Sequence, residues 1–134
     1  MEITRASKKG VYCLVVQLLR RHSLEIGRLG TFLFPAGFYV YVGSAQGNLE
    51  HRIRRHLRQE KKMRWHIDYL LPYGRVVSVH TYAGEKQKEC LLSREIGKMR
   101  DASVPVKGFG SSDCTCNAHL YYFRHAPLIS RFKI

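Results

Sequence analysis

Residues 37–43, Gly-Phe-Tyr-Val-Tyr-Val-Gly, are the stretch of sequence on which the fold depends. Aromatic and β-branched residues favour a strand, and successive side chains of a strand point to opposite faces. A strand over residues 38–42 therefore places Tyr39 and Tyr41 on one face, and the phenylalanine and both valines on the other. The sequence predicts that both tyrosines share one side of a sheet.

A second buried strand is predicted over residues 10–19, which are rich in valine and leucine. The sheet is expected to centre on these two strands. The segment between them is an insertion with two short strands, 24–29 and 31–34, separated by a glycine. Further strands are expected over residues 76–82 and 119–124.

Asn48 is a suitable N-cap for a helix over residues 49–60, in which apolar residues recur every four positions. Arg52 and His56 lie one above the other beside this apolar stripe, so they occupy the edge of the buried face. The arginines of this helix that are expected to point to solvent are Arg54, Arg55 and Arg58.

A short helix is expected over residues 65–71, before a proline, and a longer one over residues 85–100. The longer helix turns its apolar residues toward the core, and Glu89 lies on that same face. A carboxylate on the core side of a helix is costly unless something pairs with it. Glu89 is therefore expected to have a partner, and Glu95 lies at the opposite edge of the inner face.

Together these elements predict an α+β fold in which helices flank a mainly antiparallel sheet. A length of 134 residues suits one domain, which we expect to cover residues 10–124. A flexible N-terminus is expected at residues 1–9 and a C-terminal tail at 125–134. The start of the chain lacks a secretory signal, and no apolar run approaches the ~20 residues of a membrane helix, so a cytoplasmic protein is expected.

The chain is strongly basic, because 23 Lys and Arg stand against 10 Asp and Glu, with a formal net charge of +13. Such a charge attracts polyanions, and nucleic acid is the expected partner. No helix combines this charge with a broad apolar face, which argues against a membrane surface. A solvated basic face is the alternative. The residues expected to contact nucleic acid are Arg54, Arg55, Arg58, Lys61, Lys62, Arg64 and His66.

Four cysteines in a chain without an export signal are expected to be reduced thiols or metal ligands rather than disulfides. Cys13 falls in a predicted strand and is expected in the core. Cys114, Cys116 and His119 offer the soft and imidazole ligands that Zn²⁺ prefers, and Asp113 adjoins them. The fourth ligand of a zinc site is missing from this segment. A turn with buried thiols is the alternative.

Four motifs occur along the chain in a distinctive order. Gly10-Val11-Tyr12 opens the first strand, and Tyr41-Val42-Gly43 closes a later one. A helix follows with the pattern Gly47-x-Leu49-x-x-Arg52-x-x-x-His56, and a still later helix carries Glu89. In order and spacing, these motifs resemble the GIY-YIG nuclease superfamily. The segments that extend the resemblance to one little-characterised branch are 27–30, 35–45, 65–70 and 108–120.

This resemblance implies an active site whose residues are Tyr12, Tyr41, Arg52 and Glu89. It implies that Glu89 holds a single divalent metal ion, and Glu95 is the alternative ligand. Mg²⁺ or Mn²⁺ suits one carboxylate aided by water and substrate oxygens. The two tyrosine motifs often sit close together in this superfamily, so the insertion between them is a departure. The branch includes proteins fused to endonuclease-III-like DNA glycosylases, which implies a DNA repair enzyme as a partner.

The predicted residue types suit phosphodiester hydrolysis, which needs an activated water, charge relief at phosphate and protonation of the leaving oxygen. Tyr12 would deprotonate or orient the water. Its phenolate needs nearby positive charge or a metal ion, because the pKa of tyrosine is about 10, and Arg52 is a candidate source of that charge. Arg52 would also stabilise charge at the phosphate. Tyr41 would bond to water or phosphate, and His56 would assist proton transfer.

The function expected from the sequence is therefore a metal-dependent endonuclease that acts on DNA rather than RNA. The alternative is a nucleic-acid-binding module that cuts slowly or not at all and grips the backbone with its arginines. Such a module would have no need of Glu89, so the residues favour catalysis.

Overall fold

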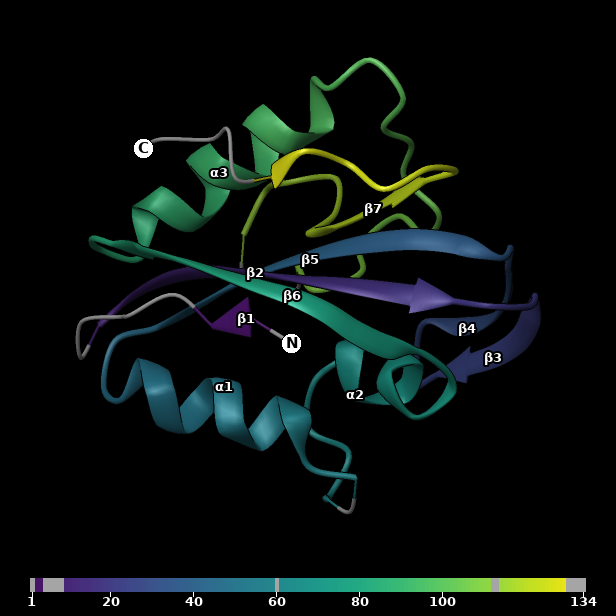
Figure 1. Cartoon of the computed structure of the whole chain (residues 1–134), viewed down its shortest axis with the longest axis horizontal. Helices are drawn as coiled ribbons and strands as arrows, with labels where there is room; N and C mark the ends of the chain where they lie inside the picture. The colour runs from purple at the N-terminus through teal and green to yellow at the C-terminus, as the bar shows by residue number, and fades with distance from the viewer. Residues whose placement is uncertain (1, 4–8, 60, 112–113, 130–134) are drawn as a thin grey trace.

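Strand β2, Gly10–Leu18, forms the centre of the sheet, because it pairs along both of its edges (Figure 1). Its neighbours are β5, Gly37–Ala45, and β6, Arg75–Ala83, both antiparallel to it. The edge strands are β7, Leu120–Phe123, antiparallel to β5, and β1, Glu2–Ile3, parallel to β6. The residues that this computed structural model describes are 2–3, 9–59, 61–111 and 114–129.

A two-stranded hairpin fills the insertion between β2 and β5. Its strands are β3, His22–Ile26, and β4, Gly30–Phe34. The helices are α1, Leu49–Leu57, α2, Ile67–Leu70, the short 3-10 helix η1, Leu71–Tyr73, and α3, Gln87–Gly97. The predicted α+β fold with a mainly antiparallel sheet is confirmed. Among the described residues, no helix has the length and apolar character needed to cross a membrane.

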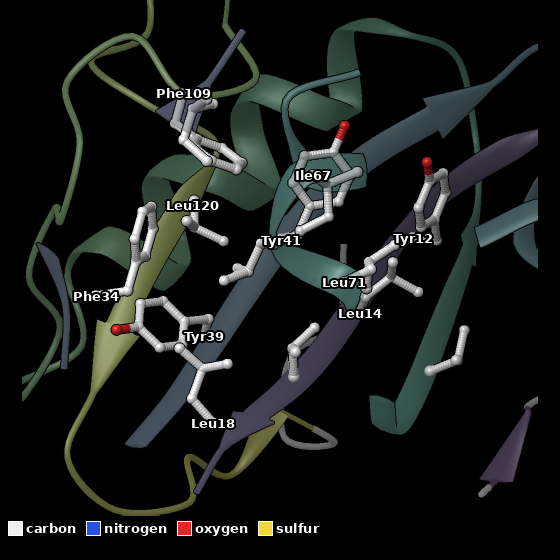
Figure 2. Close-up of a cluster of buried hydrophobic side chains, with 14 of the residues drawn as sticks. Tyr12, Leu14, Leu18, Phe34, Tyr39, Tyr41, Ile67, Leu71, Phe109 and Leu120 are labelled. Carbon is white, nitrogen blue, oxygen red and sulfur yellow. The ribbon is translucent and has the colours of Figure 1, made fainter. Parts of the chain in front are cut away.

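The two faces of the sheet are covered by different layers, with α1 and α2 on one side and α3 on the other (Figure 1). Tyr39 and Tyr41 pack into the apolar cluster on the side of α1 and α2, together with residues of β3 and β4 (Figure 2). Val40 and Val42 pack on the opposite side, against Leu92 of α3. The alternation predicted for this strand is therefore confirmed, and it assigns each side chain of β5 to a layer.

All three predicted helices are shorter than expected. α1 ends at Leu57, because Arg58 is already extended, with φ −70° and ψ 141°. α2 begins only at Ile67, and the carboxylate of Asp68 accepts the backbone N–H groups that lie just before the helix. α3 is confined to Gln87–Gly97. In each case the centre of the helix was predicted. The start of α1 at Leu49 agrees as well, and the other helix ends differ.

The packing extends beyond the predicted domain limits of 10–124. Glu2–Ile3 pairs with Ser78 and Val79 of β6, so the sheet begins earlier in the chain than expected. Ile129 is buried in the cluster on the side of α3. The other parts of the two predicted terminal segments, residues 1, 4–8 and 130–134, lie outside the described residues.

Asn48 caps α1 as predicted, since its side-chain oxygen accepts the N–H of His51 at 2.9 Å. Asn48→Ala is expected to lower the free energy of unfolding by about 1 kcal/mol, because a backbone N–H at the helix start loses its acceptor. Urea denaturation measures this. Asn48→Asp keeps the acceptor and is expected to match the wild type; equal losses in both variants would contradict the capping role.

Candidate active site and metal centre

A groove opens at the edge of the sheet where β5 runs past the end of β7. β7 pairs with β5 only as far as Tyr41, and the next residues of β5, 42–44, line the groove. Side chains from both helical layers reach it around this edge, and its volume is about 440 Å³. The predicted site residues that line the groove are Tyr12, Tyr41, Arg52, Arg64, His66 and Glu89.

The two predicted tyrosines lie on neighbouring strands with their ring centroids 6.4 Å apart. Tyr12 stands opposite Gly43 in the β2–β5 pair, and its ring lies across the backbone of that glycine. A Cβ atom at Gly43 would come within 2.5 Å of the Tyr12 hydroxyl. Gly43 is thus required for the position of the Tyr12 ring, because that ring is itself buried and has no room to move away.

His56 lies behind Tyr12 and not in the groove. It is 2% exposed, and its Nε2 atom is 2.7 Å from the Tyr12 hydroxyl. Its other ring nitrogen, Nδ1, is 3.9 Å from Oδ1 of the fully buried Asp68. Burial lowers the pKa of His56 to about 3, although the Asp68 carboxylate opposes this shift. The imidazole is therefore neutral near pH 7, and we assign its proton to Nδ1, so that Nε2 accepts from Tyr12.

Both tyrosine hydroxyls are held in the protonated form. Burial raises the pKa of Tyr12 and of Tyr41 above the usual value of about 10, and the guanidinium of Arg52 opposes this only in part. The charge of Arg52 alone therefore does not favour a Tyr12 phenolate, because the loss of solvation outweighs it. A bound metal ion, the other expected source of positive charge, would act in the same direction as Arg52. Any proton that leaves Tyr12 has His56 Nε2 as its nearest acceptor among the contacts of the hydroxyl.

Arg52 is held at the rim of the groove by two contacts. Its Nη1 donates to the backbone oxygen of Ser44 at 2.9 Å, and its guanidinium lies 4.4 Å from the ring centroid of Trp65. The guanidinium groups of Arg55 and Arg64 also lie against Trp65, at 4.4 and 4.9 Å. Trp65 thus serves as a support for three cations, a role that the sequence did not indicate.

The prediction that Arg55 points to solvent is wrong. Its side chain is 15% exposed and its Nη atoms lie 3.3 Å from the carboxylate of the fully buried Asp68. A buried carboxylate needs such a cation, and its pairing draws Arg55 inward. Asp68 also accepts the backbone N–H groups of Arg64 and Trp65, at 2.9 and 3.0 Å. It was not predicted as a functional residue, and its only sequence signal is an acid in the first turn of a helix.

The other predicted nucleic-acid contacts divide between groove and surface. Arg64 and His66 line the groove, and His66 Nδ1 accepts the N–H of Gly110 at 2.8 Å. Burial lowers the pKa of His66. Lys86 lines the groove as well and was not predicted. The residues that lie outside the groove are Arg54, which pairs with Glu50, Arg58, Lys61, whose amino group bonds to backbone oxygens of α1, and Lys62.

Glu89 reaches the same groove from α3, on the opposite face of the sheet from the tyrosines. It is 8% exposed, and its Oε2 lies 3.0 Å from Nδ1 of the fully buried His119. The alternative ligand, Glu95, is partly exposed, pairs with Lys98 and does not line the groove. The helical phase that placed Glu89 toward the core is confirmed by this burial.

A second group of metal-ligand side chains lies beside Glu89. The ligand atoms of Cys90, Cys114, Cys116 and His119 all lie within 4.8 Å of one another, so these residues could hold a metal ion. The three predicted members of this group do come together. Cys90, the missing fourth, follows Glu89 in α3, and only its residue type could have drawn notice. Asp113 lies outside the described residues.

The fold and the site define an α+β protein with a basic groove and an adjoining cluster of cysteine and histidine. The chain matches the family described as a domain of unknown function, DUF123, over residues 11–133, and it belongs to this family. A comparison with curated proteins and another with solved structures gave no match.

A neutral, buried His56 makes stability depend on pH. The unfolded chain takes up a proton on this histidine below pH 6.5, and the folded protein does so only near pH 3, so the free energy of unfolding falls as the pH is lowered. The slope from this residue is at most about 1.4 kcal/mol per pH unit. Urea denaturation between about pH 6.5 and 5 measures it, above the range where carboxylates titrate.

His56→Gln is expected to remove this part of the slope, whatever its effect on stability at pH 7. His51→Gln is the matched control, because His51 is an exposed histidine of the same helix. It is expected to keep the slope of the wild type. A slope that stays unchanged in His56→Gln would show that His56 is not held neutral in the folded protein.

Proposed function

We propose that the groove binds nucleic acid and hydrolyses its phosphodiester bonds, as an endonuclease of the GIY-YIG kind. One observation carries this proposal. Tyr12, Tyr41 and Arg52 come from one face of the sheet and Glu89 from the other, yet all four line a single groove. Packing alone does not require a buried carboxylate and two buried phenols to share an opening with a row of cations.

Glu89 is the proposed ligand for Mg²⁺ or Mn²⁺. It is an acid that lines the groove while being nearly buried, and such ions are commonly held by one or two carboxylates together with water and substrate oxygens. The bound ion would relieve negative charge on the scissile phosphate and on the leaving oxygen. By binding the ion, Glu89 would fix the position of the metal relative to Arg52, which lies across the groove.

Tyr12, His56 and Asp68 form the proposed path for the proton of the attacking water. The Tyr12 oxygen takes a proton from water while the Tyr12 hydroxyl proton passes to His56 Nε2, 2.7 Å away. The hydroxide bonds to phosphorus, and the bond from phosphorus to the leaving oxygen breaks. The leaving oxygen takes a proton from a second water, and the hydroxide left by that water takes back the proton of His56 through the Tyr12 hydroxyl, so both side chains return to their starting forms. The Asp68 carboxylate, 3.9 Å from Nδ1, lowers the cost of the imidazolium but does not cancel the effect of burial, so the protonated His56 is a transient species and not a resting state.

The cations of the groove are the proposed grip on the nucleic-acid backbone. Arg52 is positioned by Ser44 and Trp65, so its guanidinium can meet a phosphate at little cost in side-chain entropy. Arg64 and Lys86 extend the positive charge along the groove. DNA is the proposed substrate, and a DNA glycosylase the proposed partner, in keeping with the branch of the GIY-YIG superfamily that the sequence resembles.

The test is cleavage of labelled single-stranded, duplex and branched DNA and of RNA, with Mg²⁺ or Mn²⁺. Tyr12→Phe is expected to lower the rate by about 100-fold or more, since a general base typically contributes about 10²–10⁴. Glu89→Gln is expected to lower it by at least about as much, because it removes the charge of the proposed metal ligand. Glu95→Gln is the matched control, because it makes the same change on the same helix outside the groove. Equal rates for Glu89→Gln and Glu95→Gln would contradict the proposal.

A nucleic-acid-binding module is the second candidate function, and the raised pKa values of Tyr12 and Tyr41 favour it. Phenols that hold their protons tightly can donate hydrogen bonds to phosphate without any bond being cut. Binding with no cleavage of any substrate would support this function over hydrolysis.

Binding in the groove is expected to weaken steeply with salt, with a log–log slope of about −0.9 for each duplex phosphate neutralised. Arg64→Ala should reduce the magnitude of this slope by about 1, because one contact to phosphate is lost. Arg100→Ala is the control, since Arg100 is exposed and lies outside the groove. Fluorescence anisotropy with labelled DNA at several salt concentrations measures the slope, and identical slopes for the two variants would rule out a grip by Arg64.

A further inference from the structure

The cluster of Cys90, Cys114, Cys116 and His119 has no part in the proposed hydrolysis, yet it directly adjoins Glu89. Cys90 comes from α3, and the other three come from the segment that leads into β7. Residues so far apart in the sequence are brought together with every ligand atom within 4.8 Å of the others. Such convergence of three thiols on one imidazole calls for a physical cause.

We infer that Cys90, Cys114, Cys116 and His119 bind one Zn²⁺ in a closed tetrahedral site, and that this site positions Glu89 through His119. The zinc site stands independently of the proposed hydrolysis. The positioning of Glu89 rests on it, because it concerns the residue that would hold the ion in the groove.

The distances in the cluster fit zinc. With Zn–S bonds of about 2.3 Å and Zn–N bonds of about 2.0 Å, tetrahedral geometry places neighbouring sulfurs about 3.8 Å apart and sulfur about 3.5 Å from nitrogen. His119 Nε2 lies 3.4 Å from the sulfur of Cys114 and 3.8 Å from that of Cys90. These separations need only small side-chain adjustments to become those of a bound ion.

The orientation of His119 also fits. Its ring is fully buried, with Nδ1 3.0 Å from a carboxylate oxygen of Glu89 and Nε2 directed at the sulfurs. A ligating histidine commonly turns its second nitrogen to a carboxylate, which fixes the ring and leaves the first nitrogen free to bind metal. Glu89 is the carboxylate that faces this nitrogen here, at ion-pair distance and without the alignment of a hydrogen bond. The same side chain lines the groove, so the imidazole limits the positions that the acid can adopt.

The described part of the backbone between α3 and β7 has little regular structure, so a metal ion bound there would stabilise it. Between α3 and β7, the described residues form turns and the isolated bridge of Ser103 with Tyr122, and no helix or strand. A metal that binds Cys90 of α3 and Cys114 and Cys116 of this segment would join the two. Cys13 provides a contrast, since it is fully buried in β2 and packs as an apolar side chain, whereas the three clustered thiols are only partly buried.

The zinc site is tested on wild-type protein purified under reducing conditions without chelators. Elemental analysis is expected to find one zinc per chain, and replacement by Co²⁺ should give the absorption of thiolate bound to tetrahedral cobalt. Cys90→Ser and Cys114→Ser should lose most of the metal, while Cys13→Ala, a thiol outside the cluster, should retain it. Absence of stoichiometric zinc in the wild type, or iron in its place, would overturn the site whether or not any variant folds.

The positioning of Glu89 is tested with His119→Cys. This variant offers four sulfur ligands, so it should keep zinc, but it lacks the nitrogen that faces Glu89. Mn²⁺ binding in the groove, followed by electron paramagnetic resonance, is expected to weaken about 10–100-fold, the usual effect of losing such an outer contact. Equal Mn²⁺ affinity in His119→Cys and the wild type would limit the zinc to a structural role. Failure of the wild type to bind Mn²⁺ would instead refute the proposed role of Glu89 in hydrolysis.

Discussion

The hydrogen bonding of β2 along both of its edges is the constraint from which the rest of the structure follows. Because β2 has a neighbouring strand on each side, its side chains can point only to the two faces of the sheet. Each side chain therefore packs either in the layer of α1 or in the layer of α3. The register with β5 then sets Tyr12 opposite Gly43 and Leu14 opposite Tyr41. A slip of one residue between the two strands would send Tyr12 and Tyr41 to opposite layers and dismantle the groove.

The groove exists because the sheet is uneven at one edge. β7 is short and β5 is long, so the layers that are separate elsewhere meet beyond the end of β7. Arg52, from the side of α1, and Glu89, from the side of α3, can therefore line the same groove although they belong to different layers. Asp68 and Arg55 are buried on the side of α1, and Glu89 and His119 on the side of α3. Each acid thus has its own partner on its own side of the sheet.

The sequence was sufficient where a pattern depends on a single element. The alternation of residues 38–42 gave the faces of β5, and helical phase gave the burial of Glu89. Prediction from the sequence failed where the position of a side chain depends on a partner that is distant in the sequence. Arg55 was expected in solvent because a helix viewed alone contains no sign of a buried Asp68. Cys90 was missed for the same reason, since its companions lie in a later segment and only the tertiary fold brings them together. Helix ends were the least accurate part of the prediction, because capping contacts such as those of Asp68 decide them.

The closeness of Tyr12 to Gly43 has an evolutionary consequence. No side chain can be added at residue 43 while a tyrosine remains at residue 12, so the glycine can be replaced only where the tyrosine has been replaced as well. A homologue that replaces the glycine should therefore have a smaller residue in place of the aromatic ring, and with it a different chemistry.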